Sequence, residues 1–163
     1  MNNIILIGMP GCGKSTLGVI LAKTLGYDFI DTDLIIQKNE GRKLYEIIAE
    51  DGLDAFINCE SRAICSIDTD NTVIATGGSA VLDKKAMEHL KSMGKVVYID
   101  LPPDIIKRRI NNINTRGIVM EKGESVEDVY KHRAPLYEEY ANIIFKGADT
   151  DTERAIENLI DIL

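Results

Sequence analysis

Long apolar runs are missing from this sequence of 163 residues. No segment approaches the roughly 18 consecutive apolar residues that a membrane-spanning helix requires. The first eight residues have no basic head, and their short apolar run leads into a glycine loop, so we expect no signal peptide. Internal repeats, low-complexity tracts and linker-like stretches are also missing. The length therefore favours a single domain over residues 1–163, with no membrane partner.

Positive charge and cysteine are both scarce. Lysine and arginine together number 19 against 26 aspartates and glutamates, and the formal net charge is −7. Because a nucleic-acid partner requires a basic footprint, this balance argues against one, although a small phosphate ligand remains compatible with it. The three cysteines, at positions 12, 59 and 65, are odd in number and lack paired metal-ligand spacing. We therefore expect reduced thiols and a cytoplasmic location.

Apolar patterns of two kinds alternate along the chain. Short apolar runs predict strands at 3–7, 29–31, 72–75, 96–99 and 143–145. Helical spacing, proline starts and capping residues predict helices at 14–25, 43–50, 53–67, 83–91, from 102–103 onward, from 125 through about 133 or beyond, and 152–163. Residues 111–124 are polar, without a clear period, and are predicted to form a lid loop. The alternation is typical of an α/β fold, with a parallel sheet covered by helices on both faces.

A glycine-rich loop follows the first predicted strand. Gly8 to Thr16 reads G-M-P-G-C-G-K-S-T and matches the pattern G-x-x-x-x-G-K-[ST] of phosphate-binding loops. Backbone N–H groups of such a loop surround phosphate oxygens at the start of a helix, Lys14 can reach the outer phosphates, and the Ser15 hydroxyl can ligate Mg²⁺. The alternative, a turn that binds nothing, is disfavoured by the strand before and the helix after. The candidate nucleotide-binding residues of the loop are Gly11, Cys12, Gly13, Lys14, Ser15 and Thr16.

Polar residues and glycines follow the second and third predicted strands. Asp31 and Asp33 come after the second strand, and Gly77 and Gly78 after the third. In an open parallel sheet, ligands bind beyond the carboxyl ends of the strands. One aspartate could orient the water of a metal ion and the other could accept a proton from a hydroxyl, although either alone would also suit a helix N-cap. Two glycines would let a ligand approach the backbone closely, or would simply form a tight turn.

These features together resemble the shikimate kinase family over essentially the whole chain. The P-loop is shared by many families and is not diagnostic. The more specific motifs are Asp31-x-Asp33, Gly41-Arg42 through Gly52-x-x-x-Phe56-x-x-x-Glu60, Thr76-Gly77-Gly78, the Arg109-to-Arg116 spacing, and Arg133-x-Pro135-Leu136-Tyr137.

The resemblance implies a P-loop NTPase fold with a five-stranded parallel sheet in the order 2-3-1-4-5. It further implies a lid at about 111–124 and a substrate-binding helical segment at 32–62. The implied activity is the ATP- and Mg²⁺-dependent phosphorylation of shikimate to 3-phosphoshikimate by a monomer.

Roles on the nucleotide side follow from the same resemblance. Lys14 would hold the phosphates, and Ser15 and Asp31 would serve Mg²⁺ directly or through water. Arg116 would close with the lid over the phosphates during transfer, and Arg109 would lie near the adenine.

Roles on the acceptor side follow in the same way. Asp33 would bind the acceptor hydroxyl and act as the base. Phe56, Gly77 and Gly78 would line the shikimate pocket, and Arg133 would bind the substrate carboxylate.

Three positions depart from the family pattern. Where the family reads Phe-Arg-x-x-Glu, this chain has Ile57 at the arginine position, a third glycine is replaced by Ser79, and the lid reads Arg116-Gly-Ile-Val instead of Arg-Pro-Leu-Leu. A charge-assisted hydrogen bond contributes ~1.5–3 kcal/mol, so the lost arginine could weaken acceptor binding roughly ten- to a hundredfold. Arg62 is one candidate to compensate, although it leaves the helix in a direction about 140° from position 57.

Two alternatives to shikimate phosphorylation stay open on this sequence. The first is a related kinase with another acceptor, such as a sugar acid, a polyol or a nucleoside monophosphate, and Ile57 motivates it. The second is a nucleotide-binding module without catalysis, against which the presence of Lys14, Ser15, Asp31 and Asp33 argues. An Ile57→Arg variant bears on the first alternative. A sharp fall in the KM for shikimate would reveal a missing contact, and no change would mean that another group does that work.

We predict that Lys14→Ala abolishes phosphoryl transfer while the protein stays folded, because the lysine ammonium neutralises phosphate charge that develops in transfer. ATP-dependent turnover and thermal melting of the variant and the parent protein check this. Turnover at the parental rate would contradict the assignment of the loop.

Overall fold

A five-stranded parallel sheet forms the centre of the protein, in a computed structural model that describes residues 2–110, 119–120 and 122–163. The strands run in the order β2-β3-β1-β4-β5, as predicted. Their bounds are Asn3–Ile7 for β1, Asp28–Asp31 for β2, Thr72–Ala75 for β3, Gly94–Ile99 for β4 and Ile143–Phe145 for β5. The expected α/β fold with strand order 2-3-1-4-5 is therefore confirmed.

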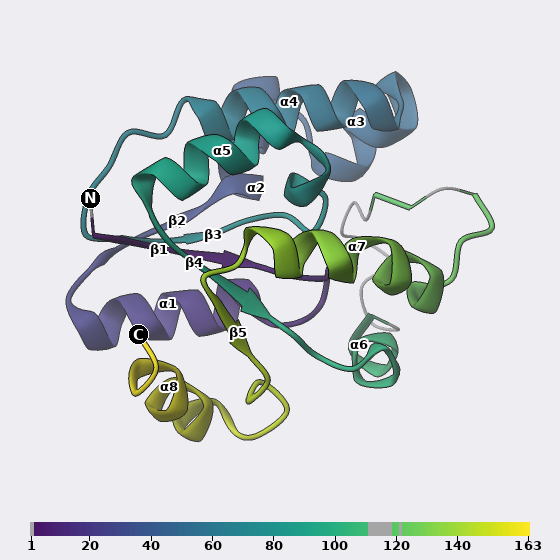
Figure 1. Ribbon diagram of the computed structural model, residues 1–163. Helices are drawn as coiled ribbons and strands as arrows, with labels where there is room; N and C mark the ends of the chain where they lie inside the picture. The colour runs from purple at the N-terminus through teal and green to yellow at the C-terminus, as the bar shows by residue number, and fades with distance from the viewer. Residues whose placement is uncertain (1, 111–118, 121) are drawn as a thin grey trace.

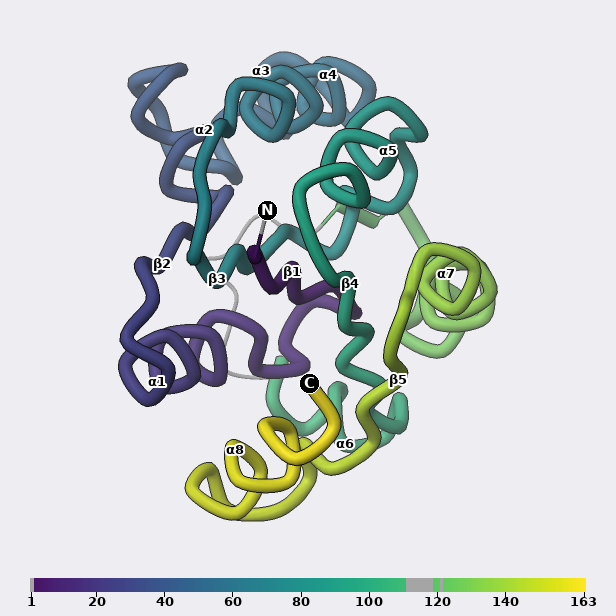
Figure 2. The backbone as a smooth tube through the Cα atoms, turned by 60° about the vertical axis from the view of Figure 1, so that its left-hand side comes forward, coloured from purple at the N-terminus to yellow at the C-terminus, as the bar shows by residue number. Residues whose placement is uncertain are grey.

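Helices cover both faces of this sheet (Figures 1 and 2). One face carries α1 and α8, and the opposite face carries α5 and α7, with α6 following the end of β4. The helices α2, α3 and α4 pack together and contact α5 through α4. The helix bounds are Lys14–Leu25 for α1, Thr32–Glu40 for α2, Leu44–Asp51 for α3, Leu53–Cys65 for α4, Lys84–Met93 for α5, Pro103–Ile110 for α6, Val126–Tyr140 for α7 and Thr152–Ile160 for α8, with a 3₁₀ turn, η1, at Ala80–Leu82.

The helix α2 is missing from the helices that the apolar pattern predicts, although the family resemblance implies a helical segment at 32–62. Its nine residues, Thr32–Glu40, are mostly polar, and only Thr32 and Ile36 are buried, so no apolar stripe reveals it. The structure shows its start signal instead: the Asp31 side chain accepts a hydrogen bond from the backbone N–H of Asp33 at 3.0 Å. The predicted helix at 53–67 ends at Cys65, and the predicted lid lies mainly outside the described residues.

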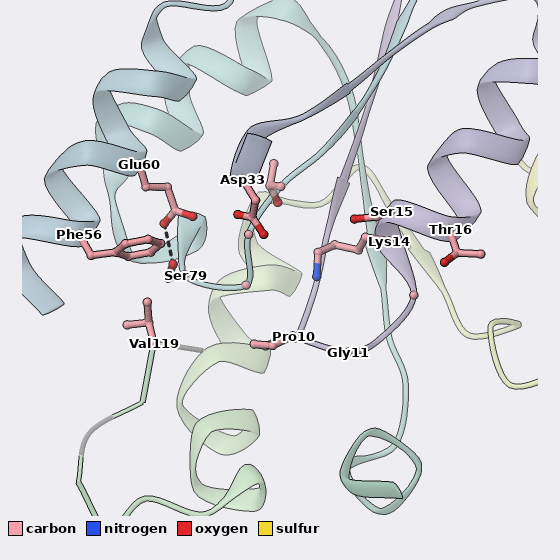
Figure 3. Close-up of a pocket in the computed structure, with 14 residues that line it drawn as sticks. Pro10, Gly11, Lys14, Ser15, Thr16, Asp33, Phe56, Glu60, Ser79 and Val119 are labelled. Atoms are coloured by element: carbon pink, nitrogen blue, oxygen red, sulfur yellow. Dashed lines mark hydrogen bonds between the residues drawn. The ribbon is translucent and has the colours of Figure 1, made fainter. Parts of the chain in front are cut away.

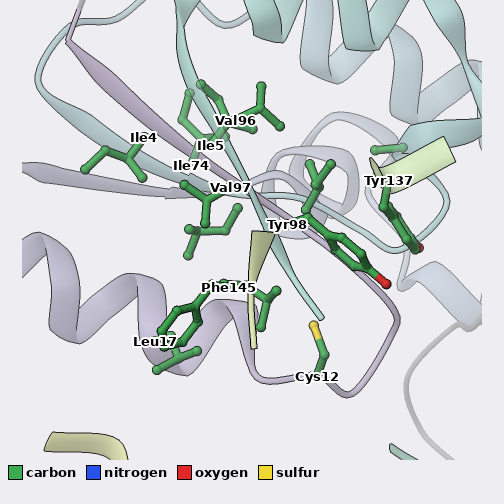
Figure 4. Close-up of a cluster of buried hydrophobic side chains, with 14 of the residues drawn as sticks. Ile4, Ile5, Cys12, Leu17, Ile74, Val96, Val97, Tyr98, Tyr137 and Phe145 are labelled. Atoms are coloured by element: carbon green, nitrogen blue, oxygen red, sulfur yellow. The ribbon is translucent and has the colours of Figure 1, made fainter. Parts of the chain in front are cut away.

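The hydrophobic core falls into two clusters of buried side chains. The larger one surrounds the sheet and includes Ile5, Ile74 and Val97, with the rings of Tyr98 and Tyr137 stacked at 5.0 Å between centroids (Figure 4). The strands β1 and β3 are buried along their whole length, as expected for a parallel sheet covered on both faces. The smaller cluster lies among α2, α3 and α4 and consists of Ile36, Leu44, Ile47, Phe56, Cys59, Ala63 and Val119.

Two expectations about the whole chain can be compared with this structure. Cys12, Cys59 and Cys65 are all free thiols, in keeping with the absence of a disulfide framework. Among the described residues, no helix combines the length and the apolar character that crossing a bilayer would demand.

A buried asparagine ties the beginning of β1 to its neighbours. Asn3 is 2% exposed, and its Nδ2 donates to the backbone oxygens of Thr69 at 2.8 Å and Met93 at 3.1 Å. Its Oδ1 accepts from the backbone N–H of Thr72 at 3.0 Å. One side chain therefore pairs three backbone groups near the ends of β1, β3 and β4.

We predict that Asn3→Ala lowers the free energy of unfolding by about 3 kcal/mol, because it leaves buried backbone groups without partners. Urea titration of the variant measures this. Asn2→Ala is the matched control, since Asn2 is exposed and engages Asp70 through its backbone N–H only. Equal midpoints for both variants would contradict the prediction.

Candidate active site

The register of the sheet brings three strand ends to one edge. Ala75 at the end of β3 pairs with Leu6 of β1 on one side and with Asp31 of β2 on the other. The Thr76 backbone N–H and side-chain hydroxyl then both donate to the Leu6 oxygen, at 3.1 and 3.0 Å. Three segments therefore leave the sheet at the same edge: the P-loop, the segment with the two aspartates, and the Gly77-Gly78 turn.

The P-loop has the backbone of a phosphate cradle. Gly11 and Gly13 have φ values of +77° and +96°, which side chains with a Cβ adopt only with strain. The ammonium group of Lys14 donates to the backbone oxygens of Gly8 and Met9, each at 2.8 Å, and the residue is 6% exposed. A buried cation thus lies at the centre of the loop, where the loop N–H groups and the start of α1 also favour an anion.

Cys12 contributes to this loop through its backbone and through its sulfur, which accepts a hydrogen bond from the Lys14 ammonium at 3.6 Å. Its side chain is fully buried and belongs to the main core (Figure 4). The thiol therefore acts as a small apolar filler, and the neighbouring Ser15 and Thr16 are exposed at the start of α1.

Ser15 and Asp31 form a pair of oxygen ligands. The Ser15 hydroxyl donates to Oδ2 of Asp31 at 2.7 Å, while Oδ1 of the same carboxylate caps α2. Asp31 therefore caps α2 with one oxygen and bonds the P-loop serine with the other. Hydroxyl and carboxylate oxygens suit Mg²⁺, and the described residues hold no group of three His, Cys, Asp or Glu side chains that could bind a metal unaided. The donor set fits a Mg²⁺ ion that is completed by phosphate and water.

A pocket of about 110 Å³ joins the P-loop to the helices α2 and α4 (Figure 3). Asp33 lies between the two sides, with Lys14 on one and Glu60 and Phe56 on the other. The lining residues are Pro10, Gly11, Gly13, Lys14, Ser15, Thr16, Asp33, Phe56, Glu60, Thr76, Gly77, Gly78, Ser79 and Val119. The P-loop and the carboxylate of Asp33 thus face one cavity.

The two glycines of this pocket are required by close contacts. A Cβ on Gly77 would lie 2.4 Å from Oε2 of Glu60, and a Cβ on Gly78 would lie 2.5 Å from Cδ of Pro10. The Gly78 oxygen also accepts from the hydroxyl of buried Tyr137 at 2.5 Å. The backbone at Gly77 and Gly78 is therefore approached closely by Glu60, Pro10 and Tyr137, which leaves no room for a side chain at either glycine.

Glu60 is a pocket residue that entered the sequence analysis only as part of a motif. It is 1% exposed, and its Oε1 accepts from the Ser79 hydroxyl at 2.6 Å. Burial, more than any charge, raises the pKa of this carboxyl to about 8, and the charge of Asp33 adds to the rise while the Ser79 hydrogen bond and the charges of Arg133 and Lys14 oppose it. Periodicity could not reveal this, because a buried acid at this position resembles a helix surface residue in the sequence.

Arg133 is buried at the margin of the acceptor side. It is 5% exposed, and its Nη2 donates to the backbone oxygen of Val119, which lies within the predicted lid segment 111–124. Arg62, considered as a substitute for the missing arginine, lies elsewhere: its side chain is 69% exposed and its Nη2 contacts Glu40 at 3.3 Å and the Cys59 sulfur at 3.2 Å. Arg62 therefore does not line the acceptor pocket.

Arg109 lies on the other side of the P-loop. Its guanidinium donates to the backbone oxygens of Cys12 at 3.3 Å and Ala148 at 3.1 Å. It lines a second cavity, of about 220 Å³, together with Gly13 and Thr16. This position beside the phosphate cradle suits the base of a nucleotide. Arg116, expected to close over the phosphates, lies outside the described residues.

The fold and this site define a P-loop phosphotransferase with a small acceptor pocket beside the nucleotide cradle. The family model described as "Shikimate kinase" matches residues 10–163. Shikimate kinase of Clostridium botulinum (strain 657 / Type Ba4) is 36% identical over 164 residues, which cover 98% of this chain and 95% of that protein. A second relative of that name, from Clostridium botulinum (strain Eklund 17B / Type B), is 39% identical over 92% of this chain and 91% of its own length.

A solved shikimate kinase from Acinetobacter baumannii, in complex with shikimate, superposes with a TM-score of 0.90 at 28% identity. The match covers 99% of this chain and 92% of that one. This chain belongs to the shikimate kinase family.

We predict that Glu60 makes stability depend on pH. Because its pKa is raised from 4.5 to about 8 on folding, its contribution is full below pH 4.5 and is lost as the pH rises through 8. The free energy of unfolding of the parent, minus that of Glu60→Gln, should therefore fall by on the order of 1 kcal/mol per pH unit across this window. Urea titrations at several pH values measure it, and a constant difference would contradict the raised pKa.

Proposed function

We propose that this protein transfers the γ-phosphoryl group of ATP to the 3-hydroxyl of shikimate and releases ADP and 3-phosphoshikimate. The observation that carries the proposal is the position of Asp33, between the P-loop lysine and the enclosed side of the pocket, in a chain of the shikimate kinase family. This arrangement supports direct transfer between two substrates held in one cavity.

On the nucleotide side, the Lys14 ammonium exchanges its backbone acceptors, Gly8 and Met9, for phosphate oxygens when ATP binds. Ser15 and Asp31 would hold Mg²⁺, directly or through water, and the ion supplies neutralisation of the phosphate charge when bound. The loop N–H groups between Gly11 and Thr16 orient the same phosphates. The chain thereby aligns the γ-phosphorus with the acceptor pocket.

On the acceptor side, Asp33 accepts the proton of the attacking hydroxyl. The hydroxyl oxygen forms a bond to the γ-phosphorus while the bond from that phosphorus to the bridging oxygen of ADP breaks. Arg133 binds the carboxylate of shikimate, and Phe56, Gly77 and Gly78 form the walls that orient its ring. Arg109 contacts the nucleotide base, and Arg116 joins the phosphates from the lid.

The proposal includes two properties of the whole protein. With 28% charged residues and an acidic net charge, the chain suits a monomer that acts in the cytoplasm. Size-exclusion chromatography with light scattering tests the oligomeric state.

A second candidate is a kinase of the same family with a different acceptor. Ile57 favours it, because a half-buried isoleucine cannot pair with the carboxylate of an acceptor. Thermal-shift measurements with shikimate, sugar acids, polyols and nucleoside monophosphates separate the two candidates, since a ligand stabilises the protein that binds it. A shift with shikimate alone excludes this second candidate.

A coupled assay with ATP, Mg²⁺ and shikimate tests the main proposal. ADP release that depends on shikimate is the expected result. Release that is no faster with shikimate than without it, in well-folded protein, rejects the proposal.

We predict that Asp33→Asn lowers kcat by about a hundredfold or more and changes the KM for ATP little, because an amide cannot accept the hydroxyl proton. Asp28→Asn is the matched control, since Asp28 is exposed at the opposite end of β2. Steady-state kinetics of both variants measure the effect. Equal kcat values for the two variants would remove Asp33 from the base position.

A further inference from the structure

Two buried polar atoms near the acceptor pocket have no hydrogen-bond partner among the described residues. They are Oε2 of Glu60 and Nη1 of Arg133. Both side chains are more than nine-tenths buried, and the other end of each is already bound, Oε1 by Ser79 and Nη2 by Val119. A buried unpaired polar atom costs about 1–3 kcal/mol, so a site that keeps two of them is built for a ligand that pairs them.

The Oε2 atom of Glu60 lies where a second carboxylate also points. The position of a Cβ on Gly77 would be 2.4 Å from Oε2 of Glu60 and 3.1 Å from Oδ1 of Asp33. Two negative charges that flank the same point of a buried wall oppose one another, so ionisation of one disfavours ionisation of the other. Glu60 is the one enclosed by protein, whereas Asp33 is half-buried at the start of α2.

The titratable groups that face Glu60 come from three helices, α1, α2 and α7. Asp33 of α2 disfavours its ionisation, while Lys14 of α1 and Arg133 of α7 favour it. The hydroxyl of Tyr137 is also near, but burial raises the pKa of that phenol far above neutrality, so it carries no charge. Burial of Glu60 outweighs the two cations and keeps its proton in place near neutral pH.

We propose that Glu60 binds the acceptor as a neutral acid, with the proton on Oε2 donated in a hydrogen bond to an acceptor oxygen. This inference rests on the proposed function, and it identifies a specificity-determining residue for that reaction. Oε1 of Glu60 already accepts the hydrogen bond from the Ser79 hydroxyl. The proton is therefore carried by Oε2, the oxygen that is available to the ligand.

The acceptor side then has two hydrogen-bond donors, one charged and one neutral. Nη1 of Arg133 is a charged donor for a carboxylate, and the Glu60 proton is a neutral donor for a second oxygen. Ile57 is half-buried on the same helix as Glu60, and Arg62 is turned away to Glu40. Among the described residues, no arginine lines the pocket itself, and Arg133 lies at its margin. A neutral glutamic acid thus supplies a donor without adding a charge beside Asp33.

The pH dependence of shikimate KM tests this in the full-length enzyme. For the parent protein, KM for shikimate should rise about tenfold per pH unit above the pKa of Glu60, since the ionised group neither donates nor tolerates an anionic ligand. In Glu60→Gln, whose amide donates at every pH, this rise between pH 7 and pH 9.5 should disappear. The KM for ATP reports general effects of pH on the nucleotide side.

Glu88→Gln is the matched control, because Glu88 is an exposed carboxylate on α5 that pairs with Lys84 at 3.6 Å. It should keep the parental profile. Ser79→Ala is a second variant: removing the hydrogen bond that favours ionisation should move the midpoint of the profile to higher pH. A rise in KM that is the same in Glu60→Gln as in the parent, or a midpoint that moves to lower pH in Ser79→Ala, overturns the proposal.

The ionisation of Glu60 can also be read without any acceptor. In protein labelled with ¹³C at the glutamate carboxyls, the resonance missing from Glu60→Gln identifies Glu60, and its chemical shift follows its protonation. A midpoint near 8 is expected, and a midpoint near the ordinary value of 4.5 overturns the proposal. If the parent protein shows no turnover with shikimate, the proposed function fails, whereas this titration decides the state of Glu60 separately.

Discussion

The parallel pairing of β1, β2 and β3 is the constraint on which the site depends. Leu6, Ala75 and Asp31 lie in one row across the sheet, so three different loops leave it at one level. The hydrophobic burial of β1 and β3 on both faces holds this row in place, together with the hydrogen bonds of Asn3 and Thr76 to the neighbouring backbone. Because packing elsewhere supplies the stability, the polar side chains near the pocket can keep unpaired donors and acceptors that a ligand pairs.

The P-loop and most of the helices and strands can be predicted from the sequence, because they depend on short motifs and on the local spacing of apolar residues. The P-loop pattern, from Gly8 to Thr16, marks the turn between a strand and a helix. The helix α1 begins at Lys14 and ends at Leu25, as the apolar spacing predicts. The bounds of β1, β3 and β5 follow in the same way from continuous apolar runs, whereas β2 and β4 begin one and two residues earlier than predicted. The strand order and the individual roles came instead from family resemblance, since pairing of distant strands leaves no local mark. The roles of Asp33 and Arg133 are still predictions.

What the sequence did not reveal is set by contacts between distant residues. Helix α2 has a polar surface on most sides, so its existence depends on the Asp31 cap and on packing against α4. The state of Glu60 depends on its burial and on Ser79, which is 19 positions away. Likewise, the direction of Arg62 is determined by Glu40 on a neighbouring helix, and helical geometry alone gave only an angle.

The separation of the two hydrophobic clusters has a mechanical consequence. Phe56, in the wall of the acceptor pocket, and Val119 both belong to the smaller cluster. The two therefore pack in a cluster separate from the one that surrounds the sheet. Separating the helices of the smaller cluster exposes fewer apolar side chains than unfolding the sheet does. It therefore requires less free energy. Backbone amides of α2–α4 should accordingly exchange with deuterated solvent sooner than those of β1 and β3, and the acceptor could enter or leave while the nucleotide cradle stays intact.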